Sequence, residues 1–350
     1  MKKLFLLLLL GFTLLGFSQN TLIPDPNFEQ ALIDLGYDTA PINGSVPTAN
    51  ISDVTSLDVS NNNIADLTGI EDFIALIDLS CDSNQLTSLD VSNNTALITL
   101  YCYSNQLTSL DVSNNAALIY LICFNNQLTS LDVSNNTALT FLSCNENQLT
   151  SLDVSNNTAL TELYCAFNQL TSLDVSANPA LTALTCYTNQ LTSLDVSSNN
   201  ALTELYCFNN QLTSLDVRNG NNISIGVFNA TNNPNLTCIF VDDTAYSTAN
   251  WTGIDPASTF VNNEAECEAL SLGDNAFELD VTIYPNPTDN YLFIEGNKNP
   301  ISISIYNLLG AEVIAKSNTD KIDVSELSNG VYIIKISDGI GQTDRKFIKN

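Results

Sequence analysis

The stretch LTELYCAFNQLTSLDVSANPA, residues 160–180, is the unit from which most of the chain is built. A less regular unit begins at Val54 and a degraded one at Ile223. Between them, near-identical units start every 21 residues, at Leu76, Leu97, Leu118, Leu139, Leu160, Leu181 and Leu202. A fixed period of this length is typical of a solenoid, in which each unit packs only on its neighbours.

Alternation within a unit predicts how one turn folds. Leu163 and Cys165 alternate with Glu162 and Tyr164, a period of two that indicates an extended stretch. The segment LDV at 173–175 alternates in the same way. We therefore expect two extended stretches per turn with leucine, cysteine and valine pointing inward, and neighbouring turns stacked as parallel strands about 4.8 Å apart.

The repeated pattern LxxLxCxxNQL resembles the leucine-rich-repeat signature, and LTSLDVSNN nearly repeats it within the same unit. This nesting is similar to the irregular 21-residue class of bacterial leucine-rich repeats, over about residues 54–245. The resemblance implies a mostly β fold, a solenoid of 21-residue turns with parallel strands. Because the ends of a stack must be covered, we expect an N-terminal cap at 19–53 and a C-terminal cap at 246–267. The N-terminal cap should hold a helix that begins at Asp25-Pro26.

The first residues, MKKLFLLLLLGFTLLGFSQN, place two lysines before a short apolar run. This order predicts a secretory signal peptide at 1–18. The run is short for a spanning helix and no later segment is apolar enough, so we expect no membrane span after cleavage. Residues 268–277 are expected to form a linker.

Residues 278–350 alternate in short strands separated by turns, which predicts a small C-terminal β-sandwich. The segment resembles the C-terminal sorting domain of type IX secretion cargo. The matching pieces are YPNPT (284–288), IYNLLGAEV (305–313), SNGVYIIKI (328–336) and RKFIK (345–349). The resemblance implies that the type IX secretion machinery is a partner of residues 278–350, and that the product is secreted or attached to the outer-membrane surface.

The charge distribution excludes several classes of function. The chain carries a formal charge of −28, and residues 19–273 hold 27 acidic residues against one basic residue, Arg218. Nucleic acid is excluded as a partner because nothing in this stretch neutralises phosphates, while neutral glycans, basic proteins and Ca²⁺ remain open. The chain has no histidine, which removes Ser-His and Cys-His pairs and histidine-containing zinc sites. We expect no enzyme, no catalytic residue, no metal site and no cofactor.

Two sets of cysteines call for different interpretations. A metal site needs ligands that converge on one point, and in-register parallel strands hold Cβ atoms farther apart than the 3.8 Å or so that a disulfide prefers. Core packing is therefore favoured over disulfides, metal or redox chemistry for the column formed by Cys81, Cys102, Cys123, Cys144, Cys165, Cys186 and Cys207. Cys238 and Cys267 lie outside the register in an exported chain, so a disulfide between them is expected.

Aspartates and asparagines also form columns. Asparagine amides after each stretch can satisfy backbone groups at the bends. Outward carboxylates about 5 Å apart repel by roughly 0.8 kcal/mol per pair before screening. Either Ca²⁺ or hydrogen bonds from neighbouring serines could relieve that repulsion, and both remain open for Asp90, Asp111, Asp132, Asp153, Asp174, Asp195 and Asp216.

Variation between units is concentrated around the cysteine, where aromatic residues occupy the outward positions. An exposed aromatic stripe indicates an interaction site, although aromatic ladders also stabilise a sheet. The predicted ligand-binding residues are Tyr101, Tyr103, Tyr120, Phe124, Phe141, Tyr164, Phe167, Tyr187, Tyr206 and Phe208. The sequence thus predicts an exported binding or adhesion protein that recognises a protein or glycan, or alternatively a structural surface-layer or adhesive element without a discrete ligand.

Overall fold

The computed structural model describes residues 19–273, 281–295, 302–337 and 342–350. The chain divides into one compact unit that ends at Asn262 and a second that begins at Asn263. The predicted signal peptide, 1–18, and the last part of the predicted linker, 274–277, lie outside the described residues.

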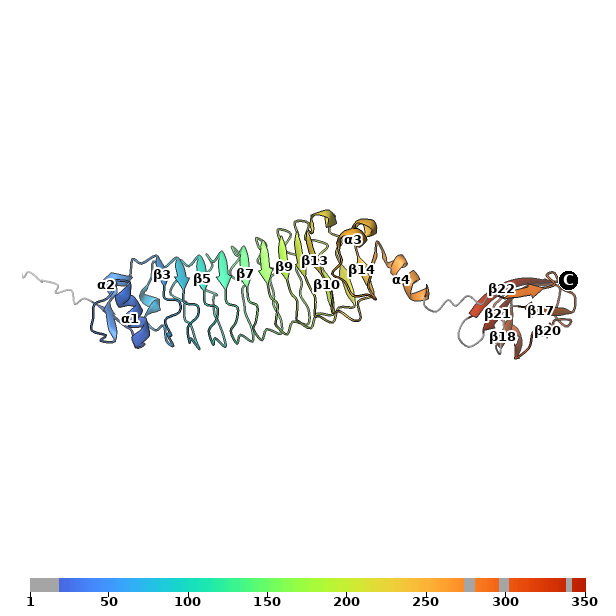
Figure 1. Cartoon of the computed structure of the whole chain (residues 1–350), viewed down its shortest axis with the longest axis horizontal. Coiled ribbons are helices and arrows are strands. Elements are labelled where there is room, and N and C mark those ends of the chain that lie inside the picture. The colour runs from blue at the N-terminus through green and yellow to red at the C-terminus, as the bar shows by residue number, and fades with distance from the viewer. Residues whose placement is uncertain (1–18, 274–280, 296–301, 338–341) are drawn as a thin grey trace, which may run out of the picture. The chain divides into compact units, whose positions relative to one another are not determined.

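The first unit is a stack of turns whose cysteine stretches form a nine-stranded sheet (Figure 1). Neighbouring strands are parallel and in register. Leu163, for example, pairs with Leu142 of the strand before it and with Leu184 of the strand after it. The predicted leucine-rich-repeat solenoid is therefore confirmed. The strands are β3 Ser56–Asp58, β4 Asp78–Ser80, β5 Thr99–Tyr101, β6 Tyr120–Ile122, β7 Phe141–Ser143, β8 Glu162–Tyr164, β9 Ala183–Thr185, β11 Glu204–Tyr206 and β13 Val227–Asn229.

The second stretch of each turn differs from the expected continuous strand ladder. Only its C-terminal members pair as a parallel sheet, made of β10 Ser193–Asp195, β12 Ser214–Asp216, β14 Cys238–Phe240 and β15 Thr259–Val261. Among the earlier described turns, the aspartate stretch has one isolated bridge, between Asp90 and Asp111. In every turn the aspartate accepts the N–H two residues later, as Asp132 does from Ser134 at 2.9 Å. The same local bond is present at Asp195 and Asp216, where the stretches do pair, so it accompanies both arrangements.

The N-terminal cap contains β1 Asn20–Leu22, α1 Pro26–Asp34, β2 Ser45–Pro47 and α2 Thr48–Ile51, and the 3-10 helix η1, Ile70–Asp72, follows β3. The helix predicted at Asp25-Pro26 is confirmed. Asp25 Oδ1 accepts the N–H groups of Asn27 and Phe28, while Oδ2 accepts those of Ala65 and Asp66 at 2.6 and 3.0 Å. The Asp25 carboxylate thus caps helix α1 and links the N-terminal cap of the solenoid to its first turn.

The stack continues past residue 245, where the repeat was expected to end, because β14 and β15 extend the parallel sheet. The 3-10 helix η2, Asn222–Ser224, and the helix α3, Thr244–Asn250, complete this end. The Trp251 ring stacks on Phe228 with centroids 4.4 Å apart. The last turns are therefore covered by aromatic packing.

Leucine, cysteine and valine side chains from successive turns form one continuous core. Asparagine amides link the turns along its edge. The Nδ2 of Asn105, for example, donates to the carbonyls of Cys81 and Cys102 at 3.1 Å each. The predicted role of the asparagine columns in satisfying backbone groups is confirmed by this repeated pattern.

The second unit begins with α4, Glu264–Gly273, and continues as two antiparallel sheets. Both sheets contribute side chains to one core, as Leu292, Ile305 and Ile334 do, which confirms the predicted small sandwich. The strands are β16 Thr282–Tyr284, β17 Tyr291–Glu295 and β20 Lys321–Asp323 in one sheet, and β18 Ser302–Asn307, β19 Glu312–Ser317, β21 Gly330–Ser337 and β22 Gln342–Lys349 in the other.

The linker predicted at 268–277 is corrected over its first part, because residues 268–273 are helical in α4. The helix begins with a reciprocal cap. Asn263 Oδ1 accepts a hydrogen bond from the backbone N–H of Glu266, and Glu266 Oε1 accepts one from the side-chain Nδ2 of Asn263, each at 3.0 Å. With glutamate, alanine and leucine following, this capping arrangement favours helix over linker.

Candidate ligand-binding face

The outward side chains of β4–β9 and β11, with the two residues after each cysteine, form one surface of the solenoid, here called the aromatic face. At one end of it, Tyr103 stacks on Phe124 with centroids 4.5 Å apart and planes 9° from parallel. At the other end, Tyr187 stacks on Phe208 at 4.2 Å with the same interplanar angle. Aromatic pairs of this geometry stabilise adjacent turns of a sheet.

Between these two stacks, rings from three neighbouring strands lie in contact, directly opposite from β6 to β7 and diagonally from β7 to β8. Tyr120 of β6 contacts Phe141 of β7 with centroids 6.2 Å apart, and Phe141 contacts Tyr164 of β8 at 5.4 Å. Phe167 meets Tyr187 edge-on at 5.2 Å. The structure therefore brings eight of the ten predicted residues into three ring clusters.

The ten rings differ in exposure. Tyr120 and Phe167 are the most open, at 43% and 46% exposed, and the other eight are half-buried. Tyr101 and Tyr206 lie on the same face but make no contact with another ring among the described residues. Ring contacts between turns thus account for part of the aromatic content of the face. Tyr120 and Phe167 in particular keep ring surface that a ligand could contact.

Phe167 lies one position farther from its cysteine than Phe124 and Phe208 do. Its backbone has a φ of 52°, in the left-handed region. Serine, asparagine, threonine and glutamate occupy the equivalent position in the other regular turns. A bulky aromatic residue there is a conformational outlier, and outliers of this kind cluster at functional sites.

Two tyrosines on the face are paired with carboxylates. The Tyr164 hydroxyl donates to Glu162 Oε2 at 2.7 Å. Burial, this hydrogen bond and the charges of Glu162 and Glu204 raise the pKa of Tyr164 well above its ordinary value. Hydrogen bonding to Asp82, together with burial, likewise raises the pKa of Tyr103. The face therefore presents neutral phenols beside acidic groups.

The strands β8 and β11 each carry an outward glutamate and an outward tyrosine, and β9 between them carries small outward residues. Ala183 and Thr185 of β9 are 7% and 9% exposed although they point outward, and they pair in register with Glu162 and Tyr164 on one side. The signal for this feature, ELY-ALT-ELY in three successive turns, is present in the sequence. The sequence-based prediction did not include Ala183, Thr185 or the two glutamates among the site residues.

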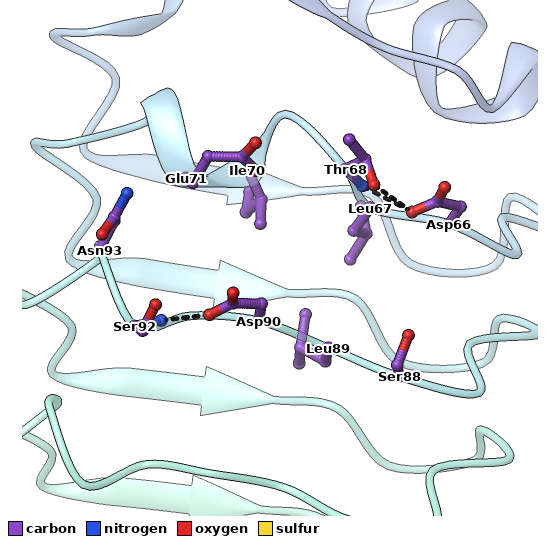
Figure 2. Close-up of a pocket in the computed structure, with 10 residues that line it drawn as sticks. All are labelled: Asp66, Leu67, Thr68, Ile70, Glu71, Ser88, Leu89, Asp90, Ser92 and Asn93. Atoms are coloured by element: carbon purple, nitrogen blue, oxygen red, sulfur yellow. Dashed lines mark hydrogen bonds between the residues drawn. The ribbon is translucent and has the colours of Figure 1, made fainter.

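The aspartate column forms shallow polar depressions between turns elsewhere on the solenoid. Figure 2 shows one of them, lined by Asp66, Thr68, Glu71, Ser88, Asp90 and Ser92, among others. Its volume is about 380 Å³. The carboxylates bond to their own turns, with the Ser92 N–H donating to Asp90 Oδ1 at 2.9 Å (Figure 2). Hydrogen bonds from Ser92 lower the pKa of Asp90.

Within the part of the chain that is described, no group of three or more histidine, cysteine, aspartate or glutamate residues is arranged to hold a metal ion. The N–H groups of Ser92, Ser113 and Ser134 donate to the aspartates two residues before them, which are the hydrogen bonds that the alternative to Ca²⁺ requires. Ca²⁺ binding by the aspartate column is tested by the chelator experiment below.

The seven in-register cysteines are free and buried, as core packing requires. Burial raises the pKa of the Cys144 and Cys207 thiols to about 12, so they are protonated and unreactive at neutral pH. Cys238 and Cys267 are each disulfide-bonded. The pairing of these two with each other remains our proposal.

Comparison with known proteins adds two findings. Residues 282–350 match the family described as the secretion system C-terminal sorting domain. Internalin J of Listeria monocytogenes serotype 4b (strain F2365) is 43% identical over 78 residues, which are 22% of this chain and 8% of that protein. The chain therefore spans only a small part of the length of this curated relative.

Two crystal structures of internalins from Listeria monocytogenes strain 4b F2365 share the fold. Internalin C2 superposes with a TM-score of 0.54 at 24% identity, covering 61% of this chain and 97% of that one. Another internalin superposes with a TM-score of 0.51 at 20% identity, covering 69% and 76%. At these identities the likeness establishes the fold alone.

Fold and tail together define an exported leucine-rich-repeat protein. Its C-terminal unit is a type IX secretion sorting domain, which directs the chain to the cell surface or the medium. No helix in the described ranges is long and apolar enough to cross a membrane.

Proposed function

We propose that the solenoid is a binding module, not a catalyst, and that its aromatic face recognises a protein or glycan ligand outside the cell. The observation that carries the proposal is the contrast between the two kinds of position in the repeat. Buried and ladder positions keep one residue type from turn to turn, whereas the outward positions of β4–β9 and β11 change and are rich in aromatic residues. Aromatic side chains dominate binding at protein interfaces because they bury large areas.

The conformation of Phe167 supports this interpretation over stacking alone. A positive φ costs an ordinary L-residue about 1–2 kcal/mol, and Phe167 is nevertheless about half exposed. A ring that served only to stabilise the sheet would gain more at the neighbouring position occupied by Phe124 and Phe208, which stack nearly parallel on their partners. An exposed and strained ring is better explained by contact with a ligand.

The proposal is tested by screening the full chain against a glycan array and a panel of extracellular proteins. The screen is repeated with the double variant Tyr120→Ser/Phe167→Asn, which removes the two most exposed rings. The control is Gln169→Ala/Gln211→Ala, which changes exposed side chains outside the aromatic face.

We expect a ligand whose affinity falls about tenfold or more in the aromatic variant and is unchanged in the control. Equal binding by both variants and the parent chain would favour the structural or adhesive element without a discrete ligand. Circular dichroism and Tm verify that each variant is folded.

A further inference from the structure

On the aromatic face, β9 carries two small outward residues, Ala183 and Thr185, between the larger outward residues of β8 and β11. Thr185 of β9 pairs in register with Tyr164 on one side and with Tyr206 on the other. Ala183 lies between Glu162 and Glu204 in the same way. Because neighbouring strands are about 4.8 Å apart, the two glutamates begin roughly 10 Å apart across a floor of small side chains. Glu162, Tyr164, Ala183, Thr185, Glu204 and Tyr206 are here called the notch, because small side chains lie between larger ones.

Strand register and one hydrogen bond bring these side chains together: Tyr164 donates to Glu162 Oε2 at 2.7 Å, and both residues pair with β9. After burial, the causes that raise the pKa of Tyr164 are its hydrogen bond to Glu162 and the proximity of Glu162, Glu204 and Tyr206. Tyr164 is on β8, whereas Glu204 and Tyr206 are on β11, so the interaction spans β9. The side chains of β8 and β11 are therefore close enough to interact across Ala183 and Thr185.

The floor of the notch presents an unused polar group. Thr185 is 91% buried as a residue, since it is 9% exposed, and it points outward between the two tyrosines. Its hydroxyl makes no hydrogen bond with any described residue. A threonine hydroxyl in such a place is stabilised when it meets a partner, and a ligand entering the notch would supply one.

The notch also lacks a cation of its own. The Glu204 carboxylate forms no hydrogen bond or ion pair with another described residue. Arg218 is the single basic residue between 19 and 273, and its guanidinium binds Asp216 with Nη2 and Oδ2 2.5 Å apart. With a formal charge of −26 on that stretch, counted as 27 acidic residues against Arg218, the missing positive charge must come from outside.

We propose that the notch binds an arginine or lysine side chain of a basic protein segment. Two carboxylates can accept the donors of a guanidinium or ammonium group, and tyrosine rings on either side attract a cation through their faces. The Thr185 hydroxyl accepts a further donor at the base. This assignment rests on the proposed binding function and narrows it to a positively charged protein ligand, in agreement with the field of the whole solenoid.

The test uses the full chain and isothermal titration calorimetry at about 150 mM salt, where long-range attraction is screened. The probe is a blocked peptide of alternating glycine and arginine, with the glycine–lysine peptide and a neutral maltooligosaccharide as comparisons. The test variant is Glu162→Gln/Glu204→Gln. The matched control is Asp153→Asn/Asp195→Asn, which removes the same two charges from the exposed aspartate column.

We expect the arginine peptide to bind about tenfold more weakly to the glutamate variant and with nearly parental affinity to the aspartate variant. A third variant, Ala183→Leu, fills the floor and keeps every charge, and it should also bind about tenfold more weakly. Equal losses in both charge variants, or full affinity in Ala183→Leu, would show diffuse attraction and overturn the notch assignment. Binding of the maltooligosaccharide in place of the peptides would overturn it as well.

Failure of the notch is distinguishable from failure of the proposed function. If the glutamate variant keeps the affinity of the parent chain while Tyr120→Ser/Phe167→Asn loses a ligand found in the screen, the binding function stands and the cation site does not. If neither set of variants alters the binding of any ligand, both proposals fall.

Discussion

Asn168 Oδ1 accepts a hydrogen bond from the backbone N–H of Leu149 at 3.0 Å, although the two residues belong to successive turns. The same amide donates through Nδ2 to the carbonyls of Cys144 and Cys165 at 3.0 and 3.2 Å. One side chain thus satisfies three buried backbone groups of two turns. The equivalent asparagines make the same hydrogen bonds between successive turns along the stack.

Replacement of Asn168 by alanine should therefore be strongly destabilising. Each orphaned buried group costs about 1–3 kcal/mol, so we expect Asn168→Ala to lower the free energy of unfolding by about 3 kcal/mol or more. Gln169→Ala, the adjacent exposed position, should stay within about 0.5 kcal/mol. Urea denaturation measures the free energy of unfolding of both variants. Equally small changes would mean that the hydrogen bonds of Asn168 are dispensable for stability.

The leucine at the centre of β8 should behave as a core residue. Leu163 is fully buried, and Leu163→Ala should lower the free energy of unfolding by about 2–5 kcal/mol. Ile74→Ala, at an exposed apolar residue, serves as the control and should cost less than about 0.5 kcal/mol. Chemical denaturation measures the free energy of unfolding of both variants. A large loss for Leu163→Ala alone shows that burial, and not the removal of an aliphatic side chain as such, determines the cost.

The cysteine column should make stability sensitive to alkaline pH. Burial raises the pKa of Cys144 and Cys207 to about 12 in the folded chain, whereas an unfolded thiol titrates near ~8.5. A raised pKa means that the thiols contribute their full stability below ~8.5 and lose it as the pH rises toward the folded value. We expect the Tm to be level between about pH 7 and 8 and to fall above about pH 9.

Thiol labelling gives an independent measurement of the same burial. Native protein at neutral pH should resist iodoacetamide, and unfolding without reductant should expose the seven free thiols. Rapid labelling of the native chain would contradict the inert role assigned to the column, and labelling of nine thiols would contradict the disulfide assigned to Cys238 and Cys267.

Phe167 should carry a cost in stability. Asparagine tolerates positive φ and occupies the equivalent position as Asn125 and Asn209, so Phe167→Asn should raise the free energy of unfolding by about 0.5–1 kcal/mol. The loss of the edge contact with Tyr187 offsets part of the gain. A more stable variant with weaker ligand binding would fit a functional strain, and a less stable one would show that the ring contributes mainly to packing.

Chelation should leave the solenoid unchanged. The aspartates already accept hydrogen bonds from serine N–H groups, as Asp153 does from Ser155 at 2.9 Å. We therefore expect the Tm to be the same with EDTA as with added Ca²⁺, in the parent chain and in Asp153→Ala. A Tm that rises with Ca²⁺ and loses that rise in Asp153→Ala would establish a metal site on this column.

Several features were predictable because they depend on residues close together in the sequence. The alternation of Leu163 and Cys165 with outward residues fixes which side chains enter the core, and Asp25 before Pro26 carries the helix-start signal. The Asn263–Glu266 cap is equally local. Its N-x-x-E spacing is visible in the sequence, although 246–267 was interpreted as the C-terminal cap and the second half of this helix as a linker.

Other features were not predictable, because they depend on the spacing between turns. The same LDV pattern pairs as a sheet at Asp195 and Asp216 but has no sheet partner at Asp153. The conformation of Phe167 follows from its position in the bend after the strand, which a list of variable residues does not reveal.

The sequence by itself determined the repeat, the buried columns, the sandwich and the sorting domain, since each is encoded by periodicity or by a contiguous motif. The tertiary structure decided which outward residues lie side by side on one surface. Glu162 and Glu204 are 42 residues apart in the sequence, and only the stacking of the turns places them on either side of Ala183 in register. That arrangement depends on side-chain size across three stacked turns, which no single turn specifies.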